Sequence, residues 1–309
     1  MNNLFICYTP FHLNMAFSII KKMKYKSNIL VYLPSIGNKK NKYYYKQSKK
    51  YYKITYSKII KLSYIKDFIY IHNLAKQIKD VNIFCAGNLK TMYSRLLLSL
   101  IKHNRLCTFD DGVGHYYKSP YFSNTKEKII GRIFLRKNFY YSSLLSKVKL
   151  HFTLYPNKNI KHKTIKLDYN SVCDSGIYLK NSNKYTLFLS RPFSEEGIMS
   201  HEKEIDLYKI IIKYEEIDYI QMHPREKSNK TNLPIFNDLL VVEDLISSGC
   251  INKLIGFSTT SLIIGKILKP STECIFYYLR NNNNLNDILT SFNIVRKKIE
   301  FNHHNRLKI

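Results

Sequence analysis

The chain lacks most of the short motifs that assign a function at once. No Asp-x-Asp pair occurs, so the usual ligands of a metal-bridged pyrophosphate site are missing. Neither a G-x-G-x-x-G run nor a P-loop is present, which argues against a dinucleotide-binding or kinase site. No His or Cys spacing is typical of zinc. We therefore expect neither a metal nor an organic cofactor.

Long apolar runs and paired cysteines are also missing. No uncharged apolar stretch reaches the roughly 18 residues that a membrane span needs. The N-terminus has no basic leader, and Thr9-Pro10 interrupts its apolar run early. The six cysteines are scattered, mostly in apolar runs where a reduced thiol packs as a small hydrophobe. These features predict a cytoplasmic protein, at most peripheral to a membrane.

Acidic residues are scarce. Lys and Arg number 50 against 22 Asp and Glu, a formal net charge of +28, which attracts anionic surfaces such as nucleic acid or acidic lipid. Codon bias in an A/T-rich genome also enriches Lys, Asn, Ile and Tyr, so the charge alone identifies no partner. The lack of a recognisable nucleic-acid-binding motif argues against nucleic acid. The basic, tyrosine-rich stretch 39–53 suits a peripheral contact with an anionic membrane surface.

Two domains fit the length of 309 residues. Both halves alternate strand-like apolar runs with helix-like segments, which predicts parallel sheets covered by helices. A polar, lysine- and asparagine-rich segment, 156–184, interrupts the alternation and is the predicted linker. We therefore predict an α/β fold of the GT-B type, in which two Rossmann-like domains, 1–155 and 185–309, face each other across a cleft.

An Asp-Asp-Gly motif follows the strand-like run Leu106–Phe109. Gly112 permits a tight turn with close approach of a ligand to the backbone. Asp110 can brace this turn while Asp111 faces the cleft and takes a proton as a general base. The competing interpretation is an ordinary Asp/Gly turn.

A His-Pro motif follows the strand-like run Tyr219–Met222. Pro224 cannot continue ladder pairing, so it ends the strand and fixes the turn that presents His223. An imidazole near a leaving phosphate can stabilise its growing charge or donate a proton, and Arg225 adds positive charge beside it. The competing interpretation is a histidine at the surface with no chemical role.

Hydroxyl residues open the helix that follows the run Lys253–Phe257. Ser258, Thr259 and Thr260 stand there in succession. One hydroxyl is explained by N-capping, but a cluster of them together with free helix N–H groups can bind a phosphate without metal.

Two further acidic sites follow predicted strands. Glu195 and Glu196 come shortly after the run Tyr185–Leu189. Glu243 follows the run Leu239–Val242, which we predict to be a strand, and could accept hydrogen bonds from ribose hydroxyls. Solvated carboxylates at a loop or a helix start are the competing interpretation for both.

In their order and spacing, these motifs resemble glycosyltransferase family 52, the lipooligosaccharide sialyltransferase group of bacteria. The matching segments are 4–13, Asp110-Asp111-Gly112, 190–197, His223-Pro224 and the hydroxyl cluster at Ser258. The resemblance implies a GT-B fold, with the first domain for the acceptor and the second for the donor. It also implies CMP-sialic acid as donor, inversion at the anomeric carbon and no metal.

The resemblance also implies roles for single residues. His223 would contact the CMP phosphate as acid or electrostatic stabiliser, Ser258 and Thr259 would hold the same phosphate, and Glu243 would bind the ribose. The remaining expected contacts are Pro224, Arg225 and Thr260 in the donor site, and Thr9, Pro10, Asp110 and Gly112 on the acceptor side.

The general base has two candidates. Related GT-B sialyltransferases use the second Asp of an Asp-Asp-Gly motif, which matches Asp111. In family 52 a carboxylate shortly before the His-Pro motif has also been assigned this role, and Glu195 and Glu196 occupy that region. We favour Asp111.

The expected acceptor is a glycan or glycolipid with a terminal sugar, galactose by preference, of lipooligosaccharide or capsule, and the resemblance allows a homodimer. Three other interpretations compete. The first is a GT-B transferase with another nucleotide-activated sugar or a polyol phosphate. The second is a nucleic-acid-binding protein suggested by the charge, and the third is an inactive partner at the membrane surface in capsule assembly.

Overall fold

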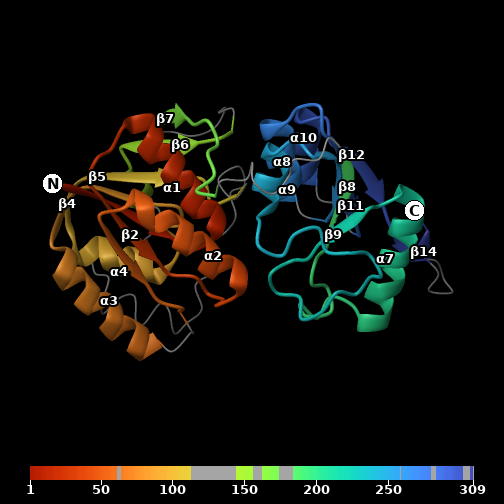
Figure 1. Ribbon diagram of the computed structural model, residues 1–309, viewed down its shortest axis with the longest axis horizontal. Coiled ribbons are helices and arrows are strands. Elements are labelled where there is room, and N and C mark those ends of the chain that lie inside the picture. Colours follow the sequence, from red (N-terminus) through yellow and green to blue (C-terminus); the bar gives the residue numbers. More distant parts are fainter. Residues whose placement is uncertain are drawn as a thin grey trace. The chain divides into compact units, whose positions relative to one another are not determined.

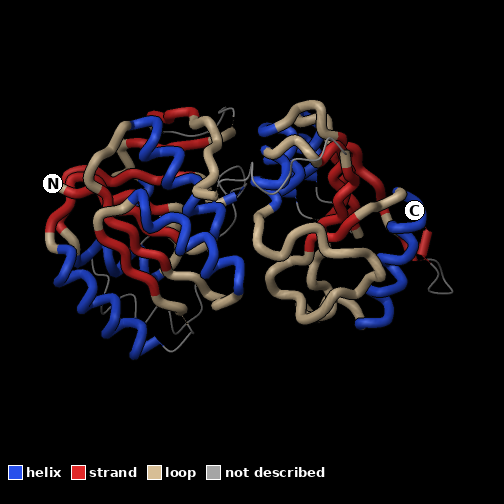
Figure 2. Tube along the Cα trace, viewed as in Figure 1, coloured by secondary structure: helices blue, strands red, loops and turns tan. Residues whose placement is uncertain are grey.

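The computed structural model describes residues 1–60, 64–112, 144–155, 162–173, 184–257, 259–279, 283–301 and 307–308. The chain forms two compact units, Met1–Cys173 and Asp174–Ile309. Each unit has its own parallel sheet, flanked by helices (Figures 1 and 2). The prediction of two Rossmann-like α/β units is therefore confirmed.

The first unit contains a seven-stranded parallel sheet in the order β3-β2-β1-β4-β5-β6-β7. Its strands are β1 (Asn2–Cys7), β2 (Asn28–Tyr32), β3 (Ile54–Ser57), β4 (Asp80–Ala86), β5 (Lys102–Phe109), β6 (Leu150–Thr153) and β7 (Lys163–Lys166). Its helices are α1 (Pro10–Met23), α2 (Lys39–Ser48), α3 (Tyr64–Ile78) and α4 (Met92–Leu100), with a 3₁₀ turn η1 (Lys49–Tyr51). The order reverses between β1 and β4, the point beyond which α/β proteins bind ligands.

The central strands form because their residues are apolar on both faces. All five residues of β2, and all but the first of β1, are buried, as expected for parallel strands covered by helices on both sides. Right-handed crossovers send α1 and α2 to one face of the sheet and α3 and α4 to the other (Figure 1). Leu4, Val81 and Leu97 belong to the core beneath α3 and α4.

The second unit contains a five-stranded parallel sheet in the order β12-β11-β10-β8-β9. Its strands are β8 (Tyr185–Leu189), β9 (Tyr219–Gln221), β10 (Ile251–Gly256), β11 (Glu273–Tyr278) and β12 (Val295–Lys298), with the short pair β13 (Glu300–Phe301) and β14 (Leu307–Lys308). Its helices are α7 (His201–Glu215), α8 (Val242–Ser247), α9 (Thr259–Leu268) and α10 (Asn283–Ser291). Here the order reverses between β8 and β10, the switch point of a flavodoxin-like sheet.

The first unit extends further along the chain than the sequence predicted. Within the expected linker 156–184, β7 pairs in parallel with β6, and Leu167 and Val172 are buried. The Val172 N–H donates to Oδ1 of Asn14 on α1 at 2.9 Å. The strand has the sequence Lys-Thr-Ile-Lys, and such polar edge strands resemble loops because only one of their sides is paired.

Residues Leu239–Val242 do not form the strand that the sequence predicted. Asn237 Oδ1 accepts the N–H groups of Leu239 and Leu240 at 2.8 and 2.9 Å, and helix α8 then begins at Val242. Side-chain acceptors of this kind compete with sheet pairing, and the acidic residues that follow favour a helix start.

The basic stretch 39–53 is mostly helical, as α2 followed by η1. Its tyrosines explain why no period was evident in the sequence, since they pack inward rather than face one solvent side. Tyr44 is fully buried, Tyr45 stacks on Tyr32, and Tyr51 packs in a tilted arrangement against Phe17. Within the described residues, no helix is both long and apolar enough to cross a bilayer.

Candidate active site

In the first unit, Asp111 receives hydrogen bonds from two other strand ends. His12 Nε2 lies 2.9 Å from Asp111 Oδ1, and Asn88 Nδ2 donates to Oδ2 at 2.5 Å. His12 follows β1, Asn88 follows β4 and Asp111 follows β5, so the three meet at the switch point of the sheet. The Asp111 side chain is 37% exposed while His12 is 1% exposed. The carboxylate is thus held in one orientation and remains accessible to a ligand.

The start of α1 determines the orientation of His12. Thr9 caps the helix, its hydroxyl accepting the His12 N–H at 3.2 Å, and Pro10 occupies the first turn, where its missing N–H costs nothing. The Tyr8 N–H donates to His12 Nδ1 at 3.3 Å. We therefore assign the proton of the neutral ring to Nε2, which donates it to Asp111.

Close packing fixes the His12 ring from both sides. Phe109 meets it edge to face, with ring centroids 5.3 Å apart. Gly87 lies against the same two rings, and a Cβ there would come within 2.8 Å of His12 Nδ1 and 2.6 Å of Phe109 Cε2. A glycine at the end of β4 is therefore what allows the imidazole to reach Asp111.

Asp110 is a buried brace. It is 1% exposed, its Oδ2 accepts the Leu154 N–H at 2.7 Å, and its Oδ1 lies 3.1 Å from His151 Nε2. Gly112 has a φ of 62°, a left-handed conformation that glycine adopts without strain. The two adjacent carboxylates thus differ in place, one inside the protein and one at the sheet edge.

In the second unit, His223 lies in a β-turn that follows β9. The Glu226 N–H donates to the His223 carbonyl at 3.0 Å, which makes Pro224 the second residue of the turn, where its fixed φ is favoured. The His223 N–H donates to Ser190 Oγ at 3.1 Å and to Glu226 Oε2 at 2.7 Å. Because Ser190 directly follows β8, the turn is tied to the neighbouring strand.

The ring of His223 presents one nitrogen for chemistry. Nδ1 accepts the Arg225 N–H at 3.2 Å, which leaves the proton of the neutral ring on Nε2. Within the described part of the chain, no hydrogen-bond partner is recorded for Nε2. Burial lowers the pKa of His223, and the nearby positive charge of Arg225 lowers it further. The group is therefore neutral at neutral pH until an anion favours its cationic form.

The carboxylates of Glu195 and Glu196 both form ion pairs with cationic side chains. Glu195 Oε2 lies 2.5 Å from Lys230 Nζ, and although burial opposes the change, this contact lowers the pKa of Glu195 to about 2. Glu196 accepts from Arg191 at 3.2 Å and from Arg225 at 3.4 Å. The low pKa of Glu195 makes it a weak proton acceptor at neutral pH.

The hydroxyl residues that we expect to bind phosphate follow β10, whose carboxyl end lies at the same edge of this sheet as those of β8 and β9. Ser258 lies outside the described residues, as does the side chain of Thr259, while the backbone of Thr259 begins α9 and Thr260 is half-buried in its first turn. The sheet order β10-β8-β9 puts the end of β10 two strands from His223. At about 4.8 Å between strands, that is roughly 10 Å, within the span of one nucleotide.

Glu243 lies in the first turn of α8 rather than at a strand end, and its residue is buried. The predicted strand end that would have placed Glu243 beside the ribose is therefore wrong, while its role as a ribose ligand, which the family resemblance also implies, stays a prediction. The acidic side chain at a helix start is explained by the helix dipole.

Five residues around these sites were not predicted from the sequence: His12, Asn88, Ser190, Glu226 and Lys230. One feature could have revealed His12, namely a Thr-Pro-x-His sequence just after the first strand, which caps a helix and places an imidazole in its first turn. The other residues act through contacts between segments that are distant in the sequence.

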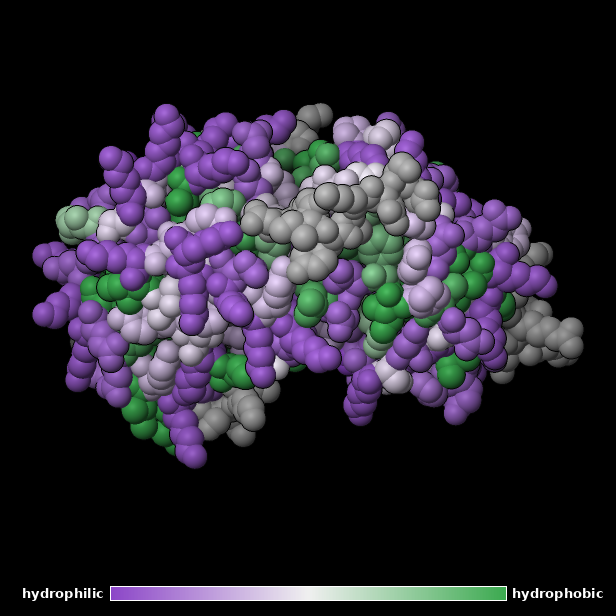
Figure 3. Space-filling view, viewed as in Figure 1, coloured by the Kyte–Doolittle hydropathy of each residue, from purple (hydrophilic) through white to green (hydrophobic). Residues whose placement is uncertain are grey.

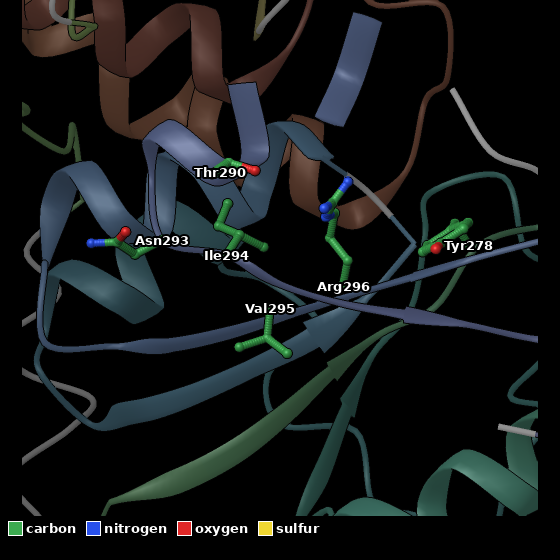
Figure 4. A pocket seen from close by; sticks show the side chains of 6 residues that line it. All are labelled: Tyr278, Thr290, Asn293, Ile294, Val295 and Arg296. Carbon is green, nitrogen blue, oxygen red and sulfur yellow. The ribbon is translucent and has the colours of Figure 1, made fainter. Parts of the chain in front are cut away.

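Two hollows are found in the described part of the second unit, and neither is lined by His223 or Thr260. One of about 490 Å³ is open and shallow, lined by Tyr278, Arg296 and residues at the end of α10 (Figure 4). Another of about 470 Å³ lies between α7 and the segment 229–233. No group of three or more potential metal ligands is found in the part of the chain that the structure describes.

Polar groups beyond the strand ends of two parallel sheets are typical of α/β enzymes that bind their ligands at this edge. The chain belongs to glycosyltransferase family 52, whose family model matches residues 16–266, and it is a glycosyltransferase.

Two bacterial relatives are sialyltransferases by name. The chain is 27% identical over 262 residues to the CMP-N-acetylneuraminate:beta-galactoside alpha-2,3-sialyltransferase of Pasteurella multocida (strain Pm70), covering 80% of this chain and 81% of that one. It is 26% identical over 197 residues to the N-acetyllactosaminide alpha-2,3-sialyltransferase of Haemophilus influenzae (strain ATCC 51907 / DSM 11121 / KW20 / Rd), covering 62% of each. A crystal structure of a UDP-N-acetylglucosamine 2-epimerase matches with a TM-score of 0.46 at 11% identity, over 96% of this chain and 84% of that one.

Proposed function

We propose that this protein is an inverting sialyltransferase that moves sialic acid from CMP-sialic acid to the terminal galactose of a bacterial surface glycan, without metal. The names of the two relatives support the donor, and the beta-galactoside in one of them supports the acceptor. The same names support an α-2,3 linkage as part of this proposal. The observation that carries the mechanism is the oriented, accessible carboxylate of Asp111 at the switch point of the first sheet.

In this reaction the acceptor hydroxyl forms a bond to the anomeric carbon while the bond from that carbon to the CMP phosphate breaks. Asp111 takes the proton of the hydroxyl as general base. His223 faces the departing phosphate, where its cationic form balances the growing negative charge or gives a proton to it. Attack opposite to the leaving phosphate inverts the anomeric centre.

The proposal needs no metal because the leaving group is a monophosphate. Its charge can be met by an imidazolium, the guanidinium of Arg225 and the N–H groups at the start of α9. The first two partners follow β9 and the third follows β10, and these strands are separated only by β8 in the same sheet. The cations on Glu195 and Glu196 favour Asp111 over either of them as base.

Donor binding tests the proposal first. CMP in excess over its Kd should raise the melting temperature of the protein, since a ligand that binds only the folded state stabilises it, whereas UDP should not. Release of CMP from CMP-sialic acid in the presence of a galactoside should then be measured with and without EDTA. Stabilisation by another nucleotide instead of CMP would favour a transferase with a different donor, and a need for divalent metal would contradict the metal-free mechanism.

Two substitutions separate the candidate bases. Asp111→Asn should lower kcat by roughly 10²- to 10⁴-fold, the usual contribution of a general base, with the CMP-induced shift in melting temperature kept. Glu196→Gln should leave most of kcat. The reverse result, an active Asp111→Asn and an inactive Glu196→Gln, would move the base to the second unit.

We further propose that the protein contacts anionic lipid through the exposed lysines of α2 on the cytoplasmic side of the membrane. Lys39, Lys42 and Lys46 of α2 recur every three or four residues and so share one helix face, which Lys49 at the start of η1 continues. These four lysines are named here the lysine face. Hydrophilic side chains cover much of the first unit in the view of Figure 3. Among the tyrosines of this stretch, Tyr44 is buried, while the half-buried Tyr45 and Tyr51 contact Tyr32 and Phe17, which leaves these rings less available for stacking on single-stranded nucleic acid.

A further inference from the structure

A buried ion cluster lies beneath the turn that carries His223. Lys230 is its centre, with a side chain that is 1% exposed. Its Nζ lies 2.5 Å from Glu195 Oε2, 2.9 Å from Glu204 Oε2 and 3.9 Å from Glu226 Oε1. We name these four residues the Lys230 cluster. A buried ammonium is retained only where carboxylates compensate its loss of water, so the cluster holds its members in one arrangement.

Each acid of the cluster fixes a different piece of backbone. Glu204 on α7 accepts the N–H groups of Phe193 and Ser194 at 3.3 and 2.9 Å, which anchors the loop after β8. Glu195 on that loop accepts the Lys227 N–H at 3.3 Å. The cluster therefore joins the segment after β8 to the segment after β9.

Glu226 extends this anchoring to the His-Pro turn itself. Its Oε2 accepts the His223 N–H at 2.7 Å and the hydroxyl of Ser190, while its own N–H closes the turn on the His223 carbonyl. His223 and Glu226 are thus joined by two hydrogen bonds. In one the His223 N–H donates to the Glu226 side chain, and in the other the Glu226 N–H donates to the His223 carbonyl. Glu226 has a side chain that is 1% exposed and does not touch the imidazole, so it acts on the position of His223 and not on its chemistry.

We propose that Glu226, supported from below by Lys230, is a positioning residue that fixes the His223 turn so that Nε2 points away from the protein toward a bound phosphate. The inference rests on the proposed function only for the role of His223. The acceptor oxygen of Glu226 is the essential feature, because it must receive both the backbone N–H and the serine hydroxyl. A leucine lacks it and a glutamine keeps it.

Three variants test the proposal. Glu226→Leu should lower kcat by roughly 10- to 100-fold, as loss of an orienting partner behind a functional histidine usually does, with a smaller change in KM for the donor. Glu226→Gln should keep kcat close to that of the wild type. Glu215→Leu is the matched control, since Glu215 is also buried and paired with Lys253 and Lys297 in the same unit, but away from the turn.

A second readout does not depend on transfer. Histidine NMR in the ligand-free protein should give His223 a pKa below its ordinary value in the wild type and in Glu215→Leu. In Glu226→Leu the pKa should rise, because a released turn exposes the ring to water, and its resonance should broaden. Should wild-type protein fail to release CMP from CMP-sialic acid, the proposed function fails while the titration still decides this inference.

Two results would overturn the positioning role. One is a Glu226→Leu protein that matches Glu215→Leu in both kcat and the His223 titration. The other is a Glu226→Gln protein as impaired as Glu226→Leu, which would show that the negative charge, and not the acceptor oxygen, is what matters.

Discussion

The hydrogen bond from His12 to Asp111 joins two residues that are 99 positions apart, and together with the bond from Asn88 it holds the direction of the carboxylate. His12→Phe keeps the edge-to-face packing on Phe109 and removes the donor. We expect kcat to fall by roughly 10- to 100-fold and not further, because Asp111 can still accept a proton when its carboxylate is no longer held in one direction. Steady-state kinetics should show little change in KM for the donor.

A double substitution is the control for this interpretation. If His12 acts only through Asp111, then His12→Phe combined with Asp111→Asn should be no slower than Asp111→Asn alone. Losses that multiply would mean that His12 contributes independently, and the positioning role of its Nε2 would be wrong.

The pH dependence of activity should report the environment of His223. Burial and then Arg225 lower the pKa of this imidazole, so its protonated form is lost at a lower pH than in a free histidine. If the cation assists phosphate departure, kcat/KM falls as the pH rises through this pKa. Arg225→Gln removes a positive charge and raises the pKa of His223.

The alkaline limb of kcat/KM should therefore move to higher pH in Arg225→Gln, although the weaker charge near the phosphate raises KM. A pH–rate profile over pH 5 to about 9 measures both effects, and histidine NMR checks the assignment. An alkaline limb that stays fixed in Arg225→Gln, while the NMR pKa rises, would exclude His223 as the titrating group.

At the scale of elements, the loop after β8 is held by charge in addition to the apolar packing of Phe193. Burial opposes ionisation of Glu195, yet Lys230 and the Lys227 N–H lower its pKa to about 2 in the folded protein. A free glutamate has a pKa of about 4.3. The ionised contact therefore stabilises the folded state above that pH, and this stabilisation is lost as the pH falls toward 2.

Glu195→Gln should unfold at lower urea than the wild type at pH 7, and the gap between the two proteins should narrow below about pH 4.5. Urea titrations at pH 7 and near pH 3 provide the comparison. Glu196→Gln is the control, because its carboxylate pairs with the half-exposed Arg191 and the exposed Arg225 and contributes little. A gap that stays constant with pH would mean that Glu195 contributes by shape and not by charge.

The elements that sequence reasoning placed well are the buried strands and the groups that follow them. Continuous apolar runs such as Leu4–Cys7 and Tyr185–Leu189 can hardly be anything but covered parallel strands, and Asp111 and His223 follow from them. The predictions for residues 163–166 and 239–242 were wrong for local reasons. The first segment is an edge strand with polar residues, and in the second an asparagine competes for the backbone N–H groups.

The contacts around the candidate site were beyond sequence reasoning because they join separate segments. His12 in an apolar helix resembles an ordinary core histidine until β5 brings Asp111 beside it. Glu226 and Lys230 stand in a polar stretch that is typical of a solvated loop, yet both side chains are 1% exposed. Their burial depends on contacts with α7 and the loop after β8, and no local sequence pattern indicates these contacts.

At the scale of the whole molecule, the two sheets differ in strand order and still share one design. The first reverses between β1 and β4, the second between β8 and β10. At the carboxyl edge of each sheet lies a group suited to proton transfer or charge stabilisation. In the first unit this group is Asp111 with His12, and in the second unit it is His223. The charge, by contrast, is spread unevenly along the chain.

The first 66 residues contain 14 lysines and neither Asp nor Glu, and the lysine face is one exposed part of this segment. No ion pair is recorded for Lys39, Lys42 or Lys46 within the described residues. Replacing these three by Gln should weaken binding to vesicles with anionic lipid by about a hundredfold, at roughly 1 kcal/mol per lysine near a charged surface. Kinetics on a soluble galactoside should be unchanged.

The matched control removes the same charge elsewhere. Lys203, Lys209 and Lys213 are exposed on α7, where Glu202 and Asp206 offset them, so their replacement by Gln should leave vesicle binding nearly intact. Co-sedimentation with vesicles of rising phosphatidylserine content measures both variants, and added salt should weaken the wild type most, because screening acts on the net field of the face. Equal losses in the two triple variants would mean that overall charge, and not α2, brings this protein to a membrane.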